Sequence, residues 1–424
     1  MTKVRTISAA QARRLAIARQ HLSDPRRQVG PNDIMDVMRD LRYLQIDPMR
    51  VVEQSHLLVL WSRLGNYDPR HMDALLWKER SLFQDWAQTT SIVLTEDYPI
   101  FSALKRTFAT GDGRPAKRIR TWIEKNQKLR DYILAELRRK GAMYSDDFED
   151  RAAEDWPSTG WTKARNVNTM LMFLWAQGII MIAGRKGIRK LWDLTERHLP
   201  EWTPREQLSD REVFRQIAQR SLHALGVATA KQIKHHYIRG CCGDVERVLA
   251  ELKAEGKVVR VAVRESTHVW SGPWFVLAND QPLLDLSAAG DLETRTTLLS
   301  PFDNLIIDRQ RTEQLFGFSF RFEVYYPKAK RKYGGYVMPI LHGDHLIGRA
   351  DTVMDRKLGQ LRMKAVYAEP SAPKTEGTIK AVAEAIKELG VFLGAKKIVY
   401  DGKVPAGWKH LLRETALDQL VNLA

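Results

Sequence analysis

Residues 179–194, IIMIAGRKGIRKLWDL, hold two apolar, β-rich runs on either side of a basic turn. The turn itself, Gly184-Arg185-Lys186-Gly187, predicts a hairpin with a tight and positively charged tip. Helical patterns precede it: a long one at 124–140, a short one beginning at 145–148, and one at 162–177. Three helices followed by a hairpin are typical of a winged helix-turn-helix module.

The same order recurs further along the chain. Helical patterns at 211–225, 229–237 and 244–255 lead into strand-like runs at 258–263 and 268–277. The first 125 residues or so also have helical patterns with short breaks, and only a brief extended piece interrupts them before Pro48. We therefore expect several winged-helix modules in tandem.

The last third of the chain has a different pattern. Strand-like segments at 302–322, 336–341, 345–353 and 361–369 predict a small β-barrel or a strongly curved sheet, and an amphipathic helix at 378–389 follows. The predicted fold class is thus α+β, with tandem winged helix-turn-helix modules followed by a small C-terminal β-barrel. The predicted domains are residues 1–123 (an N-terminal helical or winged-helix module), 124–205 and 206–290 (a second and a third winged helix), and 291–424 (the barrel with its helix).

The charge of the chain points to a polyanionic partner. The net charge is +16 with a pI near 9.7, and basic proteins of this kind gain affinity for nucleic acid by releasing condensed counterions. Between residues 105 and 140 there are 12 Lys and Arg against four acids, whereas a merely solubilising surface intersperses the two signs. Winged helices also mediate protein contacts, but the basic hairpin tips favour double-stranded DNA.

The composition excludes several other classes. Only two cysteines occur, adjacent at Cys241 and Cys242, which argues against a zinc ribbon, an iron–sulfur cluster or a disulfide framework. No run approaches the roughly 18–20 apolar residues of a membrane span, and the N-terminus lacks the apolar centre of a secretory signal. We expect a cytoplasmic monomer without membrane contact, metal or cofactor.

Three longer segments carry a resemblance to a known family. The first is Leu44-Gln45-Ile46-Asp47 with VVEQSHLLVLWSRLG at 51–65; the second is SPFDNLIIDRQRTEQLFG at 300–317; the third runs from KRKYG at 330–334 through GRAD at 348–351 to DRK at 355–357. In this order they resemble the YcaQ/AlkZ family of bacterial DNA glycosylases. The family motif has a Gln-x-Gln and a Gln-x-Asp form, and the second form makes this chain similar to the YcaQ branch.

The resemblance implies both a fold and a function. It implies three tandem winged helices and a C-terminal barrel, with Gln45 and Asp47 at the DNA-facing surface. It further implies duplex DNA containing alkylated purines as substrate and, in the YcaQ branch, unhooking of interstrand crosslinks between guanine N7 positions. The chain departs from the family pattern at Gln88-Thr89, where relatives often have His-Glu, and within Tyr333-Gly334-Gly335-Tyr336.

The chemistry of such a lesion suits these two residue types. A purine alkylated at N7 is already cationic and departs as a neutral base, so one carboxylate suffices to activate water and stabilise the sugar cation. We assign that role to Asp47 and the orientation of water or sugar to the amide of Gln45. The motif has no lysine to form a Schiff base, which favours a monofunctional hydrolase. On spacing alone, Asp47 is better explained as a helix or turn cap before Pro48, and Gln45 as a surface amide; the resemblance reverses this preference.

Other residues complete the predicted site. Candidate substrate-site residues are His56, Trp86 and Gln88, although His56 suits a core position as well and tryptophans are more often core residues. Asp303 and Asp308 are interpreted as structural. The predicted DNA contacts are Lys163, Arg165, Arg185, Lys186, Lys330, Arg331, Lys332 and Arg349.

Three alternatives belong to other classes. A non-catalytic winged-helix DNA-binding protein or regulator would share the charge and the modules, but it would need nothing from Asp47. A metal-dependent nuclease would need clustered carboxylates, which the sequence does not show. A helix-hairpin-helix glycosylase would need a Gly-x-Gly hairpin followed by a catalytic Lys/Asp pair, and neither is found.

Overall fold

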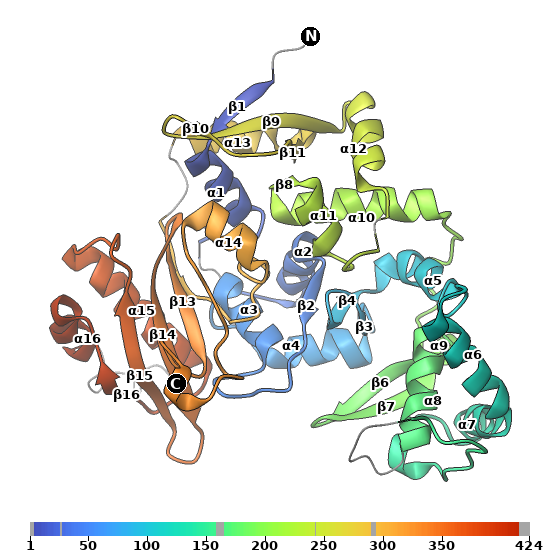
Figure 1. Ribbon diagram of the computed structural model, residues 1–424. Coiled ribbons are helices and arrows are strands. Elements are labelled where there is room, and N and C mark those ends of the chain that lie inside the picture. Colours follow the sequence, from blue (N-terminus) through green and yellow to red (C-terminus); the bar gives the residue numbers. More distant parts are fainter. Residues whose placement is uncertain (1–3, 26–27, 158–164, 242, 290–293, 415–424) are drawn as a thin grey trace. The chain divides into compact units, whose positions relative to one another are not determined.

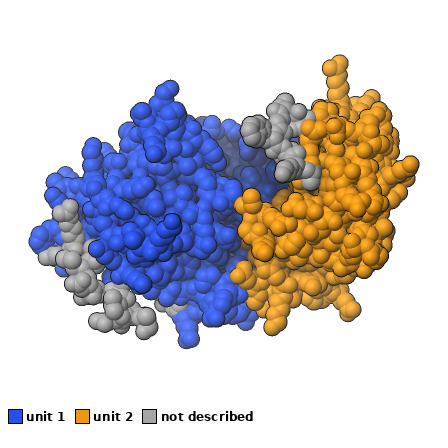
Figure 2. Space-filling view, turned by 90° about the horizontal axis from the view of Figure 1, so that it is seen from below, with its two compact units in different colours: residues 1–72, 86–91, 217–424 blue, residues 73–85, 92–216 orange. Residues whose placement is uncertain are grey.

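The computed structural model describes residues 4–25, 28–157, 165–241, 243–289 and 294–414 (Figure 1). The fold is α+β. The chain divides into two compact units, which Figure 2 distinguishes by colour. Unit 1 comprises residues 1–72, 86–91 and 217–424, and unit 2 comprises residues 73–85 and 92–216. The division into four domains predicted from the sequence is finer than this one and stays a prediction.

Unit 2 contains the hairpin predicted around Gly184-Arg185-Lys186-Gly187. Its strands are β6 (Ile180–Lys186) and β7 (Arg189–Leu194), which pair antiparallel as predicted, and β5 (Met143–Tyr144) pairs with the other side of β7. Among the described residues, the α-helices that lie wholly within this unit are α5 (Tyr98–Arg106), α6 (Arg114–Lys125), α7 (Gln127–Lys140), α8 (Arg165–Ala176) and α9 (Thr195–His198).

The predicted helix at 124–140 is divided at Asn126 into α6 and α7. The side-chain amide of Asn126 donates to the carbonyl of Trp122 at 2.9 Å, and its oxygen accepts from Ala153 N–H at 2.8 Å. The backbone N–H of Asn126 also donates to the Trp122 carbonyl, at 3.1 Å, so the Asn126 side chain adds a second bond there and attaches the junction of the two helices to the segment at Ala153. Around this break the buried core of the unit gathers Trp122, Ile133, Leu171, Trp175 and Trp192.

Unit 1 contains helices from both ends of the chain. Its helices are α1 (Ala9–Ala18), α2 (Pro31–Leu41), α3 (Ser55–Leu64), α4 (Pro69–Asp73), α11 (Ala230–His236), α12 (Val245–Ala254), α13 (Gln281–Ala289), α14 (Arg309–Phe316), α15 (Glu376–Phe392) and α16 (Lys409–Glu414), and α10 (Asp210–Leu225) enters it from unit 2. The chain passes between the units through β3 (Leu82–Trp86) and β4 (Thr90–Leu94).

One sheet of unit 1 repeats the strand order of unit 2. The strands β9 (Val258–Glu265) and β11 (Trp274–Leu277) pair antiparallel, β8 (Val227–Thr229) pairs with the far side of β11, and the short β10 (His268–Val269) pairs with β9. The order β9-β11-β8 therefore matches β6-β7-β5. In addition, β1 (Arg5–Ser8) lies parallel to β9 and extends the sheet.

The C-terminal sheet is open, and this corrects the predicted β-barrel. Its strands, in order, are β12 (Thr296–Leu298), β13 (Val337–His342), β14 (His345–Asp355), β15 (Gln360–Ala368) and β16 (Lys397–Lys403). Because β15 and β16 run parallel, the chain must cross over between them. Helix α15 makes this crossover and contacts β12, β13 and β16, so within the described residues β12 and β16 remain separate edges (Figure 1).

The expected strand at 302–322 is also wrong, because helix α14 occupies its middle. Asp308 caps the first turn by accepting a hydrogen bond from Arg311 N–H at 3.1 Å, and Gly317 ends the helix with φ +62°. The buried Arg311 side chain donates to the carbonyls of Leu225 and Val227, each at 2.7 Å. These bonds attach α14 to the β8 region.

A carboxylate shared by two histidines joins α2 to α10. Asp40 Oδ2 lies 2.7 Å from His21 Nε2, and Asp40 Oδ1 lies 2.6 Å from His223 Nε2. Asp24 Oδ2 lies 2.6 Å from the other ring nitrogen of His21. Burial alone would lower the pKa of His21, but its bonds to Asp24 and Asp40 outweigh this and raise the pKa from 6.5 to about 9.

We expect the free energy of unfolding to depend on pH through His21. A pKa raised in the folded state contributes stability that is fully present below pH 6.5 and is lost as the pH rises through about 9. Urea unfolding of the wild type should therefore lose stability across this window. His21→Asn, which tolerates the φ of +56° at this position, should show a flatter dependence, and equal slopes for the two proteins would contradict the assignment.

No helix among the described residues is long and apolar enough to cross a membrane.

Candidate active site

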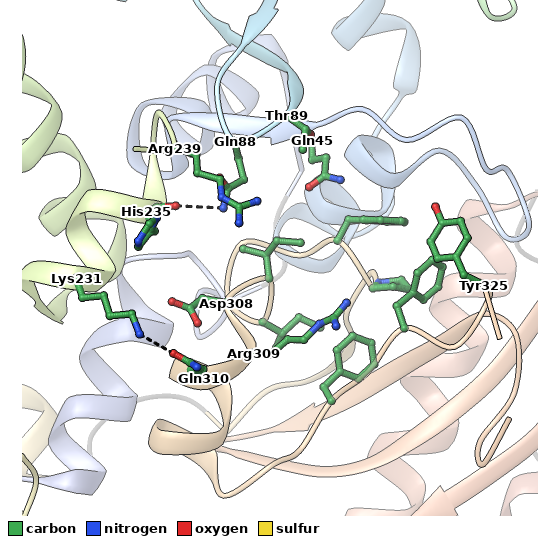
Figure 3. A pocket seen from close by; sticks show the side chains of 16 residues that line it. Gln45, Gln88, Thr89, Lys231, His235, Arg239, Asp308, Arg309, Gln310 and Tyr325 are labelled. Carbon is green, nitrogen blue, oxygen red and sulfur yellow. Dashed lines mark hydrogen bonds between the residues drawn. The ribbon is translucent and has the colours of Figure 1, made fainter. Parts of the chain in front are cut away.

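A cavity of about 590 Å³ opens in unit 1 beside the Gln-x-Asp motif (Figure 3). Part of its lining is polar and basic, with Gln45, Gln88, Lys231, His235, Arg239 and Arg309. The rest is largely apolar and aromatic, with Phe302, Ile306, Phe320, Phe322 and Tyr325. Such a cavity suits a ligand that has both a flat ring and an anionic group.

Gln45 is the last residue of β2 (Tyr43–Gln45), and its side chain lines the cavity. The backbone of this strand is held on both sides: Asn304 Nδ2 donates to the carbonyl of Tyr43 at 3.0 Å, and Ile46 N–H donates to the carbonyl of Thr90 at 2.9 Å. Among the described residues, the side-chain amide of Gln45 has no hydrogen-bond partner. Both its donor and its acceptor are therefore available to a ligand.

Asp47 lies in the loop after β2 and forms a turn. Its Oδ1 accepts from Met49 N–H at 2.9 Å, and its own N–H donates to Ser55 Oγ at 3.2 Å. Ser55 Oγ in turn donates to the carbonyl of Gln45 at 2.6 Å, so the two motif residues are held by one hydroxyl. Burial raises the pKa of the half-buried Asp47 carboxyl, and the bond from Met49 lowers it in part. Asp47 is not among the residues that line the cavity.

The loop that carries Asp47 is fastened to the C-terminal sheet. Met354 N–H on β14 donates to the carbonyl of Val51 at 3.0 Å. Arg356 donates to the carbonyl of Val52 at 2.6 Å and to Glu53 Oε2 at 3.0 Å. These contacts join the first resembling segment to the third and hold the motif loop in one position.

Comparison with known proteins decides the family. A family model described as "DNA glycosylase AlkZ-like" matches residues 38–392, which is most of the chain. The chain belongs to the AlkZ-like DNA glycosylase family. The solved structure of the Streptomyces sahachiroi DNA glycosylase AlkZ is similar with a TM-score of 0.60 and 16% identity, covering 94% of this chain and 100% of that one. At that identity the likeness concerns the fold.

The resemblance noted in the sequence is thereby confirmed, and the chain is a DNA glycosylase. It hydrolyses N-glycosyl bonds in DNA and takes part in DNA repair. Within the described residues no group of three or more His, Cys, Asp or Glu side chains is placed to hold a metal ion.

Of the three candidate substrate-site residues, the glycosylase brings one into the cavity. Gln88 lines it next to Thr89 and donates to the carbonyl of His235 at 3.1 Å. Trp86 is 58% exposed at the end of β3, and His56 is half-buried in the first turn of α3. Neither of these two lines the cavity.

Several residues of this cavity were not predicted from the sequence. Lys231 and Gln310 are hydrogen-bonded to each other at 2.9 Å, and Asp308 is the one carboxylate among the lining residues described. The aromatic lining residues come from the segment 302–325, which is rich in phenylalanine and ends in tyrosine. Aromatic rings of this kind can stack on bases, and this enrichment was the available signal.

The predicted DNA contacts of unit 2 differ in availability. Lys186 is exposed at the tip of the β6–β7 hairpin, whereas Arg185 is half-buried and its Nε donates to Gln84 Oε1 at 2.6 Å. Arg165 lies 3.3 Å from Asp155 in an ion pair. Lys163 lies outside the described residues.

The predicted contacts of the C-terminal region separate in the same way. Lys330 and Lys332 are exposed, while Arg331 is half-buried and donates to the carbonyls of Val324 and Tyr326. Arg349 is only 4% exposed, and its guanidinium pairs with Glu369 at 2.7 Å. The guanidinium of Arg349 is thus engaged within the protein, and its assignment as a DNA contact stays a prediction.

Proposed function

We propose that this glycosylase removes N-alkylated purines, above all N7-alkylguanine, with Asp47 and Gln45 as its catalytic residues. The observation that carries the proposal is the unengaged amide of Gln45 in a cavity that aromatic rings also line. A purine alkylated at N7 is cationic, and cations are attracted to the faces of aromatic rings. The cationic lining residues Lys231, Arg239 and Arg309 suit the phosphates on either side of the lesion.

The reaction follows from these groups. The bond between the sugar C1′ and N9 of the base breaks, and its electron pair neutralises the positive charge of the purine. Asp47 stabilises the sugar cation and takes a proton from the water that attacks C1′. The Oδ2 of Asp47 is suited to this role, since Oδ1 already accepts from Met49. Gln45 orients the water or the sugar.

We further propose that the sheets β6-β7-β5 and β9-β11-β8, each with the helices that precede it, form two winged-helix modules that bind duplex DNA. The protein is proposed to act as a monomer. Lys186, which is exposed at the tip of the β6–β7 hairpin, suits a phosphate contact. The same hydrolysis at one end of a crosslink between two guanine N7 atoms would release the two strands, and this is the larger substrate that we propose.

The test uses duplexes with one 7-methylguanine, one unmodified guanine or one N7–N7 crosslink. We expect alkali-labile abasic sites from the first, none from the second and strand separation from the third. A Schiff base to Lys231, the lysine that lines the cavity, would instead allow borohydride to trap a covalent complex, and we expect no trapping. Specific binding of the first duplex without excision would contradict 7-methylguanine as the substrate of this glycosylase.

A further inference from the structure

A second cavity, of about 570 Å³, lies in unit 1, and Val51 of the loop after the motif lines part of it. It is close to the first cavity. Tyr325 lines the first cavity and its chain neighbour Val324 lines the second. Adjacent residues thus contribute to two different cavities.

The lining of the second cavity is strongly basic. Lys328, Lys332 and Lys364 are exposed side chains at its edge, Arg331 also lines it, and Asp351 is the one carboxylate among the described lining residues. A groove with this balance attracts phosphate.

Two tyrosine rings, which meet edge to face, accompany these cations. Tyr333 and Tyr367 line the cavity with ring centroids 5.2 Å apart at an interplanar angle of 83°. Phosphate-binding lysines beside aromatic rings are the arrangement by which proteins hold single nucleotides of an unpaired strand.

The cavity is built into the fold and does not depend on mobile side chains alone. Gly334 has φ +139°, and a Cβ at this position would lie 2.1 Å from Asp351 Oδ2, so only glycine fits there. Tyr333 N–H donates to Glu323 Oε2 at 2.9 Å, and Tyr336 N–H donates to Asp351 Oδ1 at 3.1 Å. These bonds fix the backbone that forms one wall.

We propose that the second cavity binds a nucleotide of the DNA other than the damaged one, with its phosphate at the lysines and its base against the tyrosines. The idea rests on the proposed function in one respect, because it takes the first cavity as the place of the damaged nucleotide. The nucleotide is either the neighbour of the lesion on the same strand or the nucleotide opposite it. Tyr325, which is 78% exposed between the two cavities, is placed to occupy the gap that the displaced base leaves.

The first experiment separates filling of the cavity from loss of charge. Affinity is measured for a duplex that carries an uncleavable abasic analogue in place of the lesion, so that the readout does not depend on excision. Val324→Trp fills the cavity and keeps every charge; we expect weaker binding by about tenfold, as for the loss of one stacked base, with an unchanged salt dependence. Lys332→Ala and Lys364→Ala should each reduce the salt slope by about 1, whereas Lys374→Ala, an exposed lysine outside the cavity, is the charge-matched control.

Unchanged binding by a folded Val324→Trp would overturn the proposal. If that variant does not fold, the affinities of Lys364→Phe and Lys364→Ala are compared instead. Both substitutions remove one charge, and only Lys364→Phe places a bulky ring at the cavity. A larger defect for Lys364→Phe supports an occupied cavity, and equal defects overturn it.

The second experiment identifies the source of the nucleotide. The duplex is prepared with one further base missing, either beside the lesion position or opposite it. The defect of Val324→Trp should disappear on the duplex that lacks the base which normally enters the cavity. A defect that persists on all duplexes would show that no base enters, and it would overturn the proposal whether or not 7-methylguanine is excised.

Discussion

Replacing Asp47 by Asn is expected to reduce the rate of 7-methylguanine excision by about 10²–10⁴-fold while DNA affinity stays the same. The asparagine oxygen can still accept the hydrogen bond from Met49, so the turn is retained. What is lost is the negative charge that takes the proton of the attacking water and faces the sugar cation, and general-base help of this kind contributes about 10²–10⁴ in rate. Single-turnover excision measured beside Kd separates the two effects.

The pH profile provides a second readout of the same prediction. Because burial raises the pKa of Asp47 above its ordinary 3.8, the wild-type rate should rise with pH through that elevated value and then level off. Asp47→Asn should lack this rise.

The matched control is Asp308→Asn. Asp308 lines the cavity and caps α14, and Asn caps helices equally well, so this variant also removes a charge without removing a structural bond. We expect it to keep most of its activity. If Asp308→Asn loses excision and Asp47→Asn does not, the base is Asp308 and the assignment from the family motif is wrong.

The local elements of this fold could largely be predicted from sequence, because they depend on neighbours in the chain. The hairpin around Gly184-Arg185-Lys186-Gly187 is present as predicted, since turn glycines and β-rich flanks act over a few residues. The strands β13, β14 and β15 agree with their patterns for the same reason.

Errors arose where distant residues decide the structure. Helix α14 lies in a segment of aromatic residues with a strand-like pattern, and it is held by Arg311, which binds carbonyls more than 80 positions earlier. The predicted barrel is an open sheet because α15 returns the chain to a parallel strand. Neither arrangement leaves a periodic signal in the sequence.

The candidate site also has some features that the sequence predicts and others that depend on residues far apart in the chain. Composition predicted a polyanionic partner, and only the resemblance singled out Gln45 and Asp47. The cavity itself is assembled from residues near 45, 88, 235 and 310, whose proximity depends on the packing of several elements. Arg349 illustrates the limit of a motif, since a basic residue in a resembling segment is buried against Glu369.

Replacing Arg63 by Met is expected to have the largest effect on stability, a loss of about 3–5 kcal/mol in the free energy of unfolding. The side chains of Arg63 and Asp303 are completely buried, and two hydrogen bonds join them, one of them Nη2 to Oδ1 at 2.8 Å. Without Arg63 the carboxylate of Asp303 remains in the interior with no opposite charge, which is the costly case for a buried pair.

The loss of Arg63 should also affect the candidate active site, because the segment that carries Asp303 is hydrogen-bonded to the motif strand β2. Asp303 also accepts from Leu305 N–H at 2.9 Å, and the adjacent Asn304 donates to the carbonyl of Tyr43 in β2. We therefore expect Arg63→Met to lower excision as well as the urea midpoint. Combining Arg63→Met with Asp303→Leu should restore part of the stability, since an apolar pair avoids the unpaired charge.

The control is Arg70→Met, which breaks an ion pair whose arginine is 88% exposed. It should change neither the excision rate nor the urea midpoint. A loss of stability as large as that of Arg63→Met would show that burial is not the cause.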